Sequence, residues 1–378
     1  MRVDTALPSA SDRLWLVGLA FVAVAGLVLS WNRGSLPQRE QPAAAAVNQT
    51  APDLDLYRQV VAEVRTGRSY YAAAREQIPA HGFPIASPLN WRLPTYAWLF
   101  ALLPGPRWIQ AALVLLSLAA LAAAYVAQSR HSGKSMALAT TLLLIGVVRW
   151  ALDGEAYLAQ EPWAATLIAL SLAAHALGGK WRAAAVAAGI AALLFRELAL
   201  PYCGIAFLGA AWNRRWCETT AWAAGIALFV AFFAWHVGQV RAQLTDLAAP
   251  PGAGLAQWLR LGGLDFVLLT TRMNGLFFAA PAGLLWLYLL AALVGLANRP
   301  DETSRVACLA ALAYLLAFAV LGRPENFYWG LLPAPLLAWG AAHGPAALAR
   351  KSRACMWQFK IRCSSSASKS SSASSAIS

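Results

Sequence analysis

The sequence predicts an all-α, polytopic membrane protein with about ten transmembrane helices. Of its 378 residues, 59% are hydrophobic and 12% are charged, and the mean hydropathy is +0.53. These values lie far from those of soluble domains. No segment shows the alternating pattern of a barrel strand, so helices, which satisfy their own backbone in lipid, are expected throughout.

The candidate spans follow from apolar length, because about 17 to 25 apolar residues cross a hydrocarbon core about 30 Å thick. They are 14–30, 108–128, 135–150, 162–177, 182–195, 198–212, 221–237, 274–297, 306–321 and 327–342. The fifth and sixth are short, and only Arg196 and Glu197 separate them. The first is predicted to be an uncleaved signal anchor, with a cleaved signal peptide as the alternative.

Basic loops predict the orientation. Lysine and arginine gather in 129–134, 178–182, 213–216, 298–305 and 350–362, which all fall on one side of ten spans. Because basic loops stay inside, that side and both termini are predicted to be cytoplasmic. The alanine-rich helices and the preference for arginine suggest a bacterial plasma membrane. These loops meeting anionic lipid explain the net charge of +13 without nucleic-acid binding.

The domain organisation is simple. A transmembrane domain is predicted over 1–348, with long extracytoplasmic loops at 31–107 and 238–273, and a basic, then Ser-rich, disordered tail over 349–378. The five cysteines show no CxxC or Cys/His spacing, so neither a disulfide framework nor a zinc site is indicated.

The first long loop contains an amphipathic helix. Tyr57, Val60, Val61 and Val64 recur at helical spacing, and Gly67 marks the end of the helix. This pattern puts Asp53 just before the helix and Asp55 in its first turn. There each carboxylate could simply cap the helix, with no chemical role.

Other charged residues also fall at the predicted outer ends of the helices. Arginines there run against the positive-inside bias, which makes them candidates for function. The charged residues are Arg92, Arg149, Asp153, Glu155, Glu161, Arg196, Glu197, Asp265, Arg272, Arg323 and Glu325. On such a face, arginines could bind the phosphate of an anionic lipid substrate, and a carboxylate could accept a proton from the reacting group.

The segment 53–71, DLDLYRQVVAEVRTGRSYY, resembles the first outer-loop signature of GT-C superfamily glycosyltransferases. Within that superfamily it is similar to the polyprenol-phosphate-mannose-dependent mannosyltransferases, which read Asp-Leu-x-x-Tyr-Arg and, further on, Gly-x-x-Tyr. The matching residues here are Asp53, Leu54, Tyr57, Arg58, Gly67 and Tyr70. Looser likeness at 159–201 and 322–342 extends the resemblance over 14–342.

The resemblance implies a membrane enzyme that takes a sugar, a mannose-like hexose favoured, from a polyprenyl-phosphate carrier on the extracytoplasmic side. The acceptor would be an envelope glycolipid, polysaccharide or protein. Carried over to this sequence, Asp53 is the catalytic base and Asp55 the alternative.

The resemblance also suggests substrate-binding residues. Arg196, with Arg92 or Arg323, is expected to stabilise the leaving phosphate, with Glu197 beside Arg196. Tyr70 and His81 are candidates for sugar contacts, although the tyrosine could only anchor the loop at the membrane interface.

Glu161 has three open interpretations. It could orient the acceptor, bind a divalent metal such as Mg²⁺ or Mn²⁺, or act as an ordinary helix-start residue. No other cofactor is implied.

Three other functions stay open. A lipid or polysaccharide transporter or flippase would show internal repeats and polar groups at mid-membrane, whereas here the charges gather at the membrane edge. A non-catalytic assembly protein would not need Asp53. A ligase that moves whole oligosaccharides from a lipid pyrophosphate would not need the DLDLYR motif.

Overall fold

The computed structural model describes residues 42–86, 90–245 and 261–350, with backbone only for 42–52. These residues form helices and no strand. The α-helices are α2 (Pro42–Arg65), α3 (Tyr70–Ala80), α4 (Thr95–Leu102), α5 (Pro106–Ser132), α6 (Lys134–Val148), α7 (Gln160–Leu177), α8 (Trp181–Phe195), α9 (Leu200–Trp212), α10 (Trp216–Leu244), α11 (Gly263–Thr271), α12 (Ala282–Ala297), α13 (Glu302–Val320) and α14 (Ala334–Ala341). Short 3₁₀ helices are η2 (Arg149–Leu152), η3 (Ala156–Leu158), η4 (Glu197–Ala199), η6 (Gly275–Phe277) and η7 (Pro324–Leu331).

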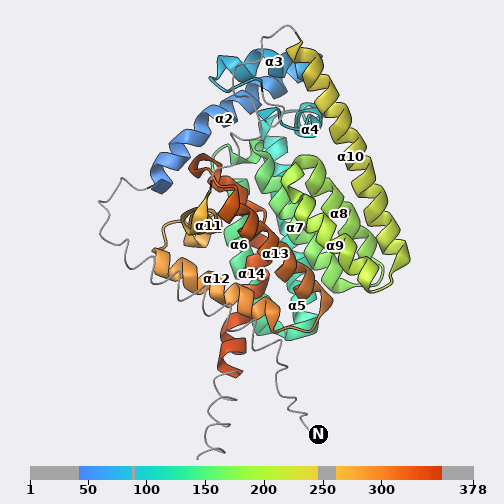
Figure 1. Cartoon of the computed structure of the whole chain (residues 1–378), viewed down its shortest axis with the longest axis vertical. Coiled ribbons are helices and arrows are strands. Elements are labelled where there is room, and N and C mark those ends of the chain that lie inside the picture. Colours follow the sequence, from blue (N-terminus) through green and yellow to red (C-terminus); the bar gives the residue numbers. More distant parts are fainter. Residues whose placement is uncertain (1–41, 87–89, 246–260, 351–378) are drawn as a thin grey trace, which may run out of the picture.

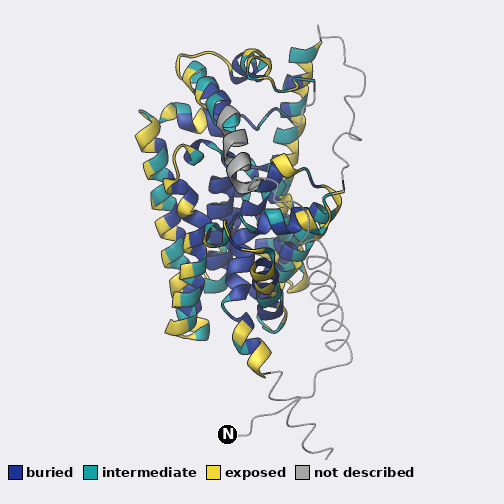
Figure 2. Ribbon diagram, turned by 90° about the vertical axis from the view of Figure 1, so that its left-hand side faces the viewer, coloured by how far each residue is buried: buried dark blue, intermediate teal, exposed yellow. Residues whose placement is uncertain are grey.

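Helix α7 forms the centre of the bundle. It packs against α5 and α8, and almost all of its residues are buried (Figures 1 and 2). A helix that is mostly apolar on all faces belongs in a core, and the small residues Ala164, Ala165 and Ala173 let its neighbours approach closely. The outer helices keep leucine and tryptophan side chains exposed, as lipid contact requires.

Four described helical segments are long and apolar enough to cross a membrane: 106–132, 134–152, 216–244 and 302–320. Shorter apolar helices cover 181–195, 197–212 and 282–297. The all-α, polytopic prediction is therefore confirmed, whereas the count of about ten spans stays a prediction. The predicted span 14–30 and the tail from 351 lie outside the described residues.

Two predicted spans are longer than the α-helices found in the structure. The stretch 274–297 begins with η6, and its α-helix α12 starts only at Ala282, after Pro281. The stretch 327–342 is divided between η7 and the short α14. Prolines 324, 333 and 335 explain the second break, since proline fixes φ and removes a backbone donor.

The basic loops converge at one end of the bundle, here called the basic end. His131 bonds the Ala176 carbonyl across 2.9 Å, and Arg299 donates to the Ser132 hydroxyl across 2.7 Å. At the same end, arginines from 178–182 and 213–216 bind acidic residues at the starts of α10 and α13. The shared side predicted for the loops 129–134, 178–182, 213–216 and 298–305 is thereby confirmed.

Helix α2 is longer than predicted, which corrects the interpretation of its aspartates. Its apolar face is as expected, with Tyr57 and Val60 buried, and Gly67 ends it with a φ of 91°. However, α2 begins at Pro42 and has no acidic residue in its first turn. Asp53 and Asp55 lie inside the helix, so neither caps its N-terminus.

Helices α12 and α14 touch through glycines. A Cβ added to Gly295 would lie 2.0 Å from the Gly340 carbonyl oxygen, and one added to Gly340 would lie 2.3 Å from the Ala292 carbonyl oxygen. Backbone atoms cannot move aside as a flexible side chain can. The two helices therefore depend on small residues at this crossing.

We expect Gly295→Ala to lower the free energy of unfolding by about 1–3 kcal/mol, because the added methyl overpacks this crossing. Thermal unfolding in detergent measures the effect. Gly283→Ala, on the same helix with nothing within 4 Å of the added Cβ, is the matched control. Equal melting temperatures for the two variants would contradict the close helix contact.

Candidate functional site

A cavity of about 350 Å³ opens at the end of the bundle opposite the basic end. Helix α7 runs from this cavity to the basic end, and α6 runs the other way (Figure 1). The volume suits a small ligand. The lining residues are Asp53, Leu54, Tyr57, Trp150, Asp153, Gly154, Glu155, Ala156, Ala159, Glu161, Pro162, Met273, Phe327, Tyr328 and Leu331.

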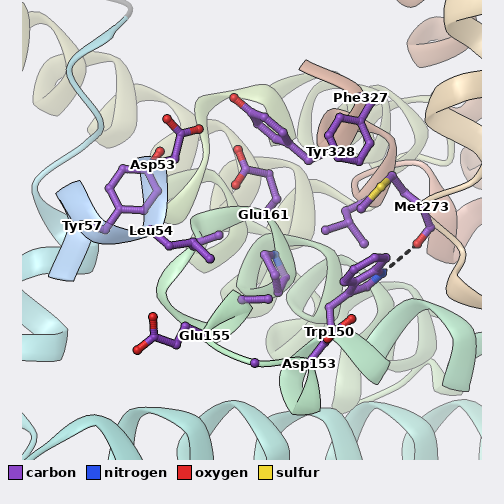
Figure 3. A pocket seen from close by; sticks show the side chains of 15 residues that line it. Asp53, Leu54, Tyr57, Trp150, Asp153, Glu155, Glu161, Met273, Phe327 and Tyr328 are labelled. Atoms are coloured by element: carbon purple, nitrogen blue, oxygen red, sulfur yellow. Dashed lines mark hydrogen bonds between the residues drawn. The ribbon is translucent and has the colours of Figure 1, made fainter. Parts of the chain in front are cut away.

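Two of the carboxylates in the lining come from helices. Asp53 projects from α2 and Glu161 from the first turn of α7, near the Tyr328 hydroxyl (Figure 3). Among the described residues, Asp53 has no hydrogen-bond or ion-pair partner. Burial raises the pKa of Asp53, Arg92 opposes this shift and the negative charge of Glu161 adds to it.

Glu161 is held by a buried arginine. Arg196 Nε lies 2.8 Å from Glu161 Oε1, and Arg196 Nη1 donates to Glu197 Oε1 across 2.9 Å. The side chains of Glu161 and Arg196 are only 3% and 2% exposed. Arg196 follows α8 and precedes η4, in the short connection that the sequence places between two spans. Of this pair, only Glu161 lines the cavity.

Arg92 lies behind two tyrosines of the lining. Its Nε donates to the Tyr57 hydroxyl across 2.9 Å, and its Nη2 donates to the Tyr328 hydroxyl across 3.2 Å. The Tyr70 hydroxyl donates to the Arg92 backbone carbonyl and fixes this segment. The guanidinium therefore orients the tyrosines without itself lining the cavity.

Asp55 faces a different environment from Asp53. It accepts from Arg58 across 2.5 Å and from Gln59 across 3.1 Å, and His81 Nε2 lies 3.2 Å from it. Arg58 also bonds Glu155, which ties α2 to the segment before η3. Asp55 thus belongs to a polar cluster beside the cavity.

A tight turn brings two more carboxylates to the cavity. Asp153 and Glu155 flank Gly154, whose φ of 52° lies in the left-handed region that glycine adopts at little cost. Arg149 holds Asp153 Oδ2 across 3.1 Å. Beside the turn, the Trp150 indole donates to the Met273 carbonyl across 2.9 Å (Figure 3).

The predicted site residues divide into two groups. Asp53 and Glu161 both line the cavity, whereas the others do not: Asp55, Tyr70, His81, Arg92, Arg196, Glu197 and Arg323. Sequence reasoning did not assign Asp153 and Glu155 to the site, although it noted their charge at an outer helix end. It gave no signal for Trp150 and Tyr328.

The structure also tests whether Glu161 could bind a metal ion. Divalent cations such as Mg²⁺ need several oxygen ligands. Within the described ranges, no group of three His, Cys, Asp or Glu side chains is arranged to hold a metal ion. Glu161 Oε1 already faces the Arg196 guanidinium. These residues do not fit a metal site at Glu161.

The fold and the cavity define a helical, polytopic membrane protein with an acidic, aromatic-walled cavity at one end of its bundle. No family model and no curated protein matches the chain. Among solved structures, it is similar to ArnT from Cupriavidus metallidurans bound to undecaprenyl phosphate, with a TM-score of 0.49 and 16% identity. The apo form of the same protein gives a TM-score of 0.44 and 17% identity. Both matches cover 88% of this chain and 60% of ArnT, so the chain spans 60% of that protein's length.

Proposed function

We propose that the protein is a GT-C-type membrane glycosyltransferase that moves a sugar from a polyprenyl-phosphate carrier to an acceptor hydroxyl, with Asp53 as general base. One observation carries this proposal. Asp53, the first residue of the DLDLYR motif, lines the cavity without a hydrogen-bond or ion-pair partner among the described residues. An unpaired carboxylate in a partly apolar cavity is well suited to accept a proton.

In the proposed reaction, the acceptor hydroxyl oxygen attacks the anomeric carbon of the sugar. The bond between that carbon and the phosphate oxygen breaks, and its electron pair leaves with the polyprenyl phosphate. Asp53 takes the hydroxyl proton as the new glycosidic bond forms, which keeps charge from building up on the acceptor oxygen. Asp55 is less suited to this role because Arg58, Gln59 and His81 surround it.

The leaving phosphate requires positive charge nearby. Of the three arginines predicted for this role, Arg196 is buried against two glutamates and Arg92 is directed at two tyrosines. Arg323, with 36% of its side chain exposed, directly precedes η7, which contributes Tyr328 to the cavity. Its guanidinium Nη1 lies 3.8 Å from Glu325 Oε1. We propose Arg323 for the phosphate because it is more exposed than Arg196 and adjoins η7, with Arg92 acting through its tyrosines.

The sidedness of the reaction is also proposed. The positive-inside rule puts the basic end in the cytoplasm, which leaves the cavity on the extracytoplasmic side of a bacterial plasma membrane. The proposed donor sugar is a mannose-like hexose, and the acceptor is an envelope glycolipid, polysaccharide or protein. The donor identity follows the sequence resemblance at Asp53, Tyr57, Arg58 and Tyr70.

The raised pKa of Asp53 predicts the pH dependence of transfer. A general base works only when deprotonated, so activity should fall as the pH drops through the pKa of Asp53. Because burial raises this pKa, the acid limb should lie above the ordinary aspartate value of 3.8. The pH profile of kcat/KM measures it. An acid limb at or below that value would argue against Asp53 as the base.

A donor panel tests the function itself. Purified protein in lipid nanodiscs is given a series of radiolabelled polyprenyl-phosphate monosaccharides together with membrane extract, and label in the extract is counted. Transfer from one donor supports the proposal. If no donor gives transfer while labelled lipid crosses the bilayer of proteoliposomes, the protein is a transporter instead.

A further inference from the structure

The hydrogen-bonding groups that face the cavity are largely acceptors. Asp53, Asp153, Glu155 and Glu161 all line it, and an ionised carboxylate can only accept. Arginines bind three of these four through one oxygen each, namely Asp153 Oδ2, Glu155 Oε2 and Glu161 Oε1. Among the described residues, the other oxygen of each of the three and both oxygens of Asp53 have no partner.

Most side-chain donors of the site are directed elsewhere, and the Tyr328 hydroxyl donates to Asn326 Oδ1 across 3.3 Å. The Trp150 indole N–H is used by the Met273 carbonyl, and Arg92 donates to the Tyr57 and Tyr328 hydroxyls. No lysine, arginine or histidine is among the lining residues. An acid group on the sugar itself would therefore meet carboxylate oxygens and no cationic lining side chain, whereas the donor phosphate is assigned to Arg323, outside the lining.

The remaining lining is aromatic. Tyr57, Trp150, Phe327 and Tyr328 stand around the same space as the carboxylates (Figure 3). Aromatic faces contact the C–H surfaces of a ring, and nearby carboxylates accept from its hydroxyls. A polyhydroxylated ring satisfies both kinds of group at once, since each hydroxyl is a donor.

We infer that the cavity takes a glycosyl group with several free hydroxyls and no acidic substituent, and that it rejects uronic acids. This inference rests on the proposed function and specifies the substrate class for the same cavity. The discrimination has two causes. A sugar carboxylate would repel the four carboxylates of the lining, and it would replace a hydrogen-bond donor with an acceptor.

Paired donors test this inference. Full-length protein in nanodiscs is given polyprenyl-phosphate mannose or polyprenyl-phosphate mannuronate on the same polyprenyl chain, and kcat/KM is measured for each. We expect mannose to be preferred by about 100-fold or more. In the Asp153→Asn/Glu155→Gln variant the preference should fall about 10-fold, because two of the four carboxylates are gone while their partners Arg149 and Arg58 keep their positive charge.

The control is Glu76→Gln, which removes an exposed carboxylate of α3 that pairs with Arg68 and does not line the cavity. Its preference should equal that of the wild type. The ratio of two donors is insensitive to a general loss of active protein. Equal use of both donors by the wild type would overturn the inference while leaving the proposed function intact.

A binding measurement separates the two proposals if no transfer occurs. The melting temperature is recorded with an alkyl mannoside and with the matching alkyl mannuronide, because a ligand of the folded state raises it. Stabilisation by the mannoside alone supports the inference even without transfer. Equal stabilisation by both, or by neither, overturns it.

Discussion

Asp53→Asn is expected to lower the rate of sugar transfer by about 100- to 10,000-fold, the usual contribution of a general base. Asparagine keeps the size of the side chain but cannot take the acceptor proton. Asp53 has no hydrogen-bond partner among the described residues. The substitution therefore breaks no hydrogen bond of the structure, and the protein should stay folded. Transfer of radiolabelled sugar at equal amounts of folded protein measures the loss.

Asp55→Asn is the matched control, because it changes the same residue type two positions along α2. It weakens the contacts with Arg58 and His81 but leaves the cavity lining unchanged. Transfer should fall by less than about tenfold, below the usual contribution of a general base. If Asp55→Asn abolishes transfer and Asp53→Asn does not, the base is Asp55. If neither reduces it, the catalytic interpretation of this segment is wrong.

Arg196→Met should lower the free energy of unfolding by about 3–5 kcal/mol. The substitution leaves the Glu161 side chain, which is 3% exposed, as a buried charge without its guanidinium partner. Most of the expected cost is the desolvation of that carboxylate, since the lost attraction alone is largely balanced by the cost of burying both charges. Chemical or thermal unfolding in detergent measures the change.

The double variant Glu161→Gln/Arg196→Met serves as the control for this mechanism. Removing both charges together should restore most of the lost stability, because neither partner is then left buried and ionised. A double variant as unstable as Arg196→Met alone would show that Arg196 acts through packing or through Glu197.

The periodicity of apolar residues predicted the helices of the fold but not the points at which helices begin, end or break. The apolar spacing of α2 and its end at Gly67 follow directly from 3.6-residue geometry. Its beginning does not, because the apolar spacing starts near Tyr57 and put Asp53 just before the helix, whereas α2 begins at Pro42. The start at Ala282 and the break at η7 depend on how prolines end or bend a helix locally.

The site residues that lie on helices could be predicted from the sequence. Asp53 and Glu161 could be expected from a motif and from a charged helix start, and both reach the cavity. Asp153 and Glu155 come from a turn and Tyr328 from a 3₁₀ segment. Hydrophobic periodicity in the sequence does not predict where side chains point in such segments. The placement of Arg92 behind Tyr57 depends on tertiary contacts between distant segments, which residue spacing alone does not encode.

Few substitutions in the turn at Gly154 would be enough to change this site over evolution. It contributes Asp153 and Glu155 within three consecutive positions, whereas Asp53 and Glu161 are built into helices of the bundle. Substitutions in the turn would alter the groups that meet a ligand, and those at Glu155 would also remove its bond to Arg58 of α2. A laboratory library confined to these positions could therefore diversify substrate choice while the proposed base stays in place.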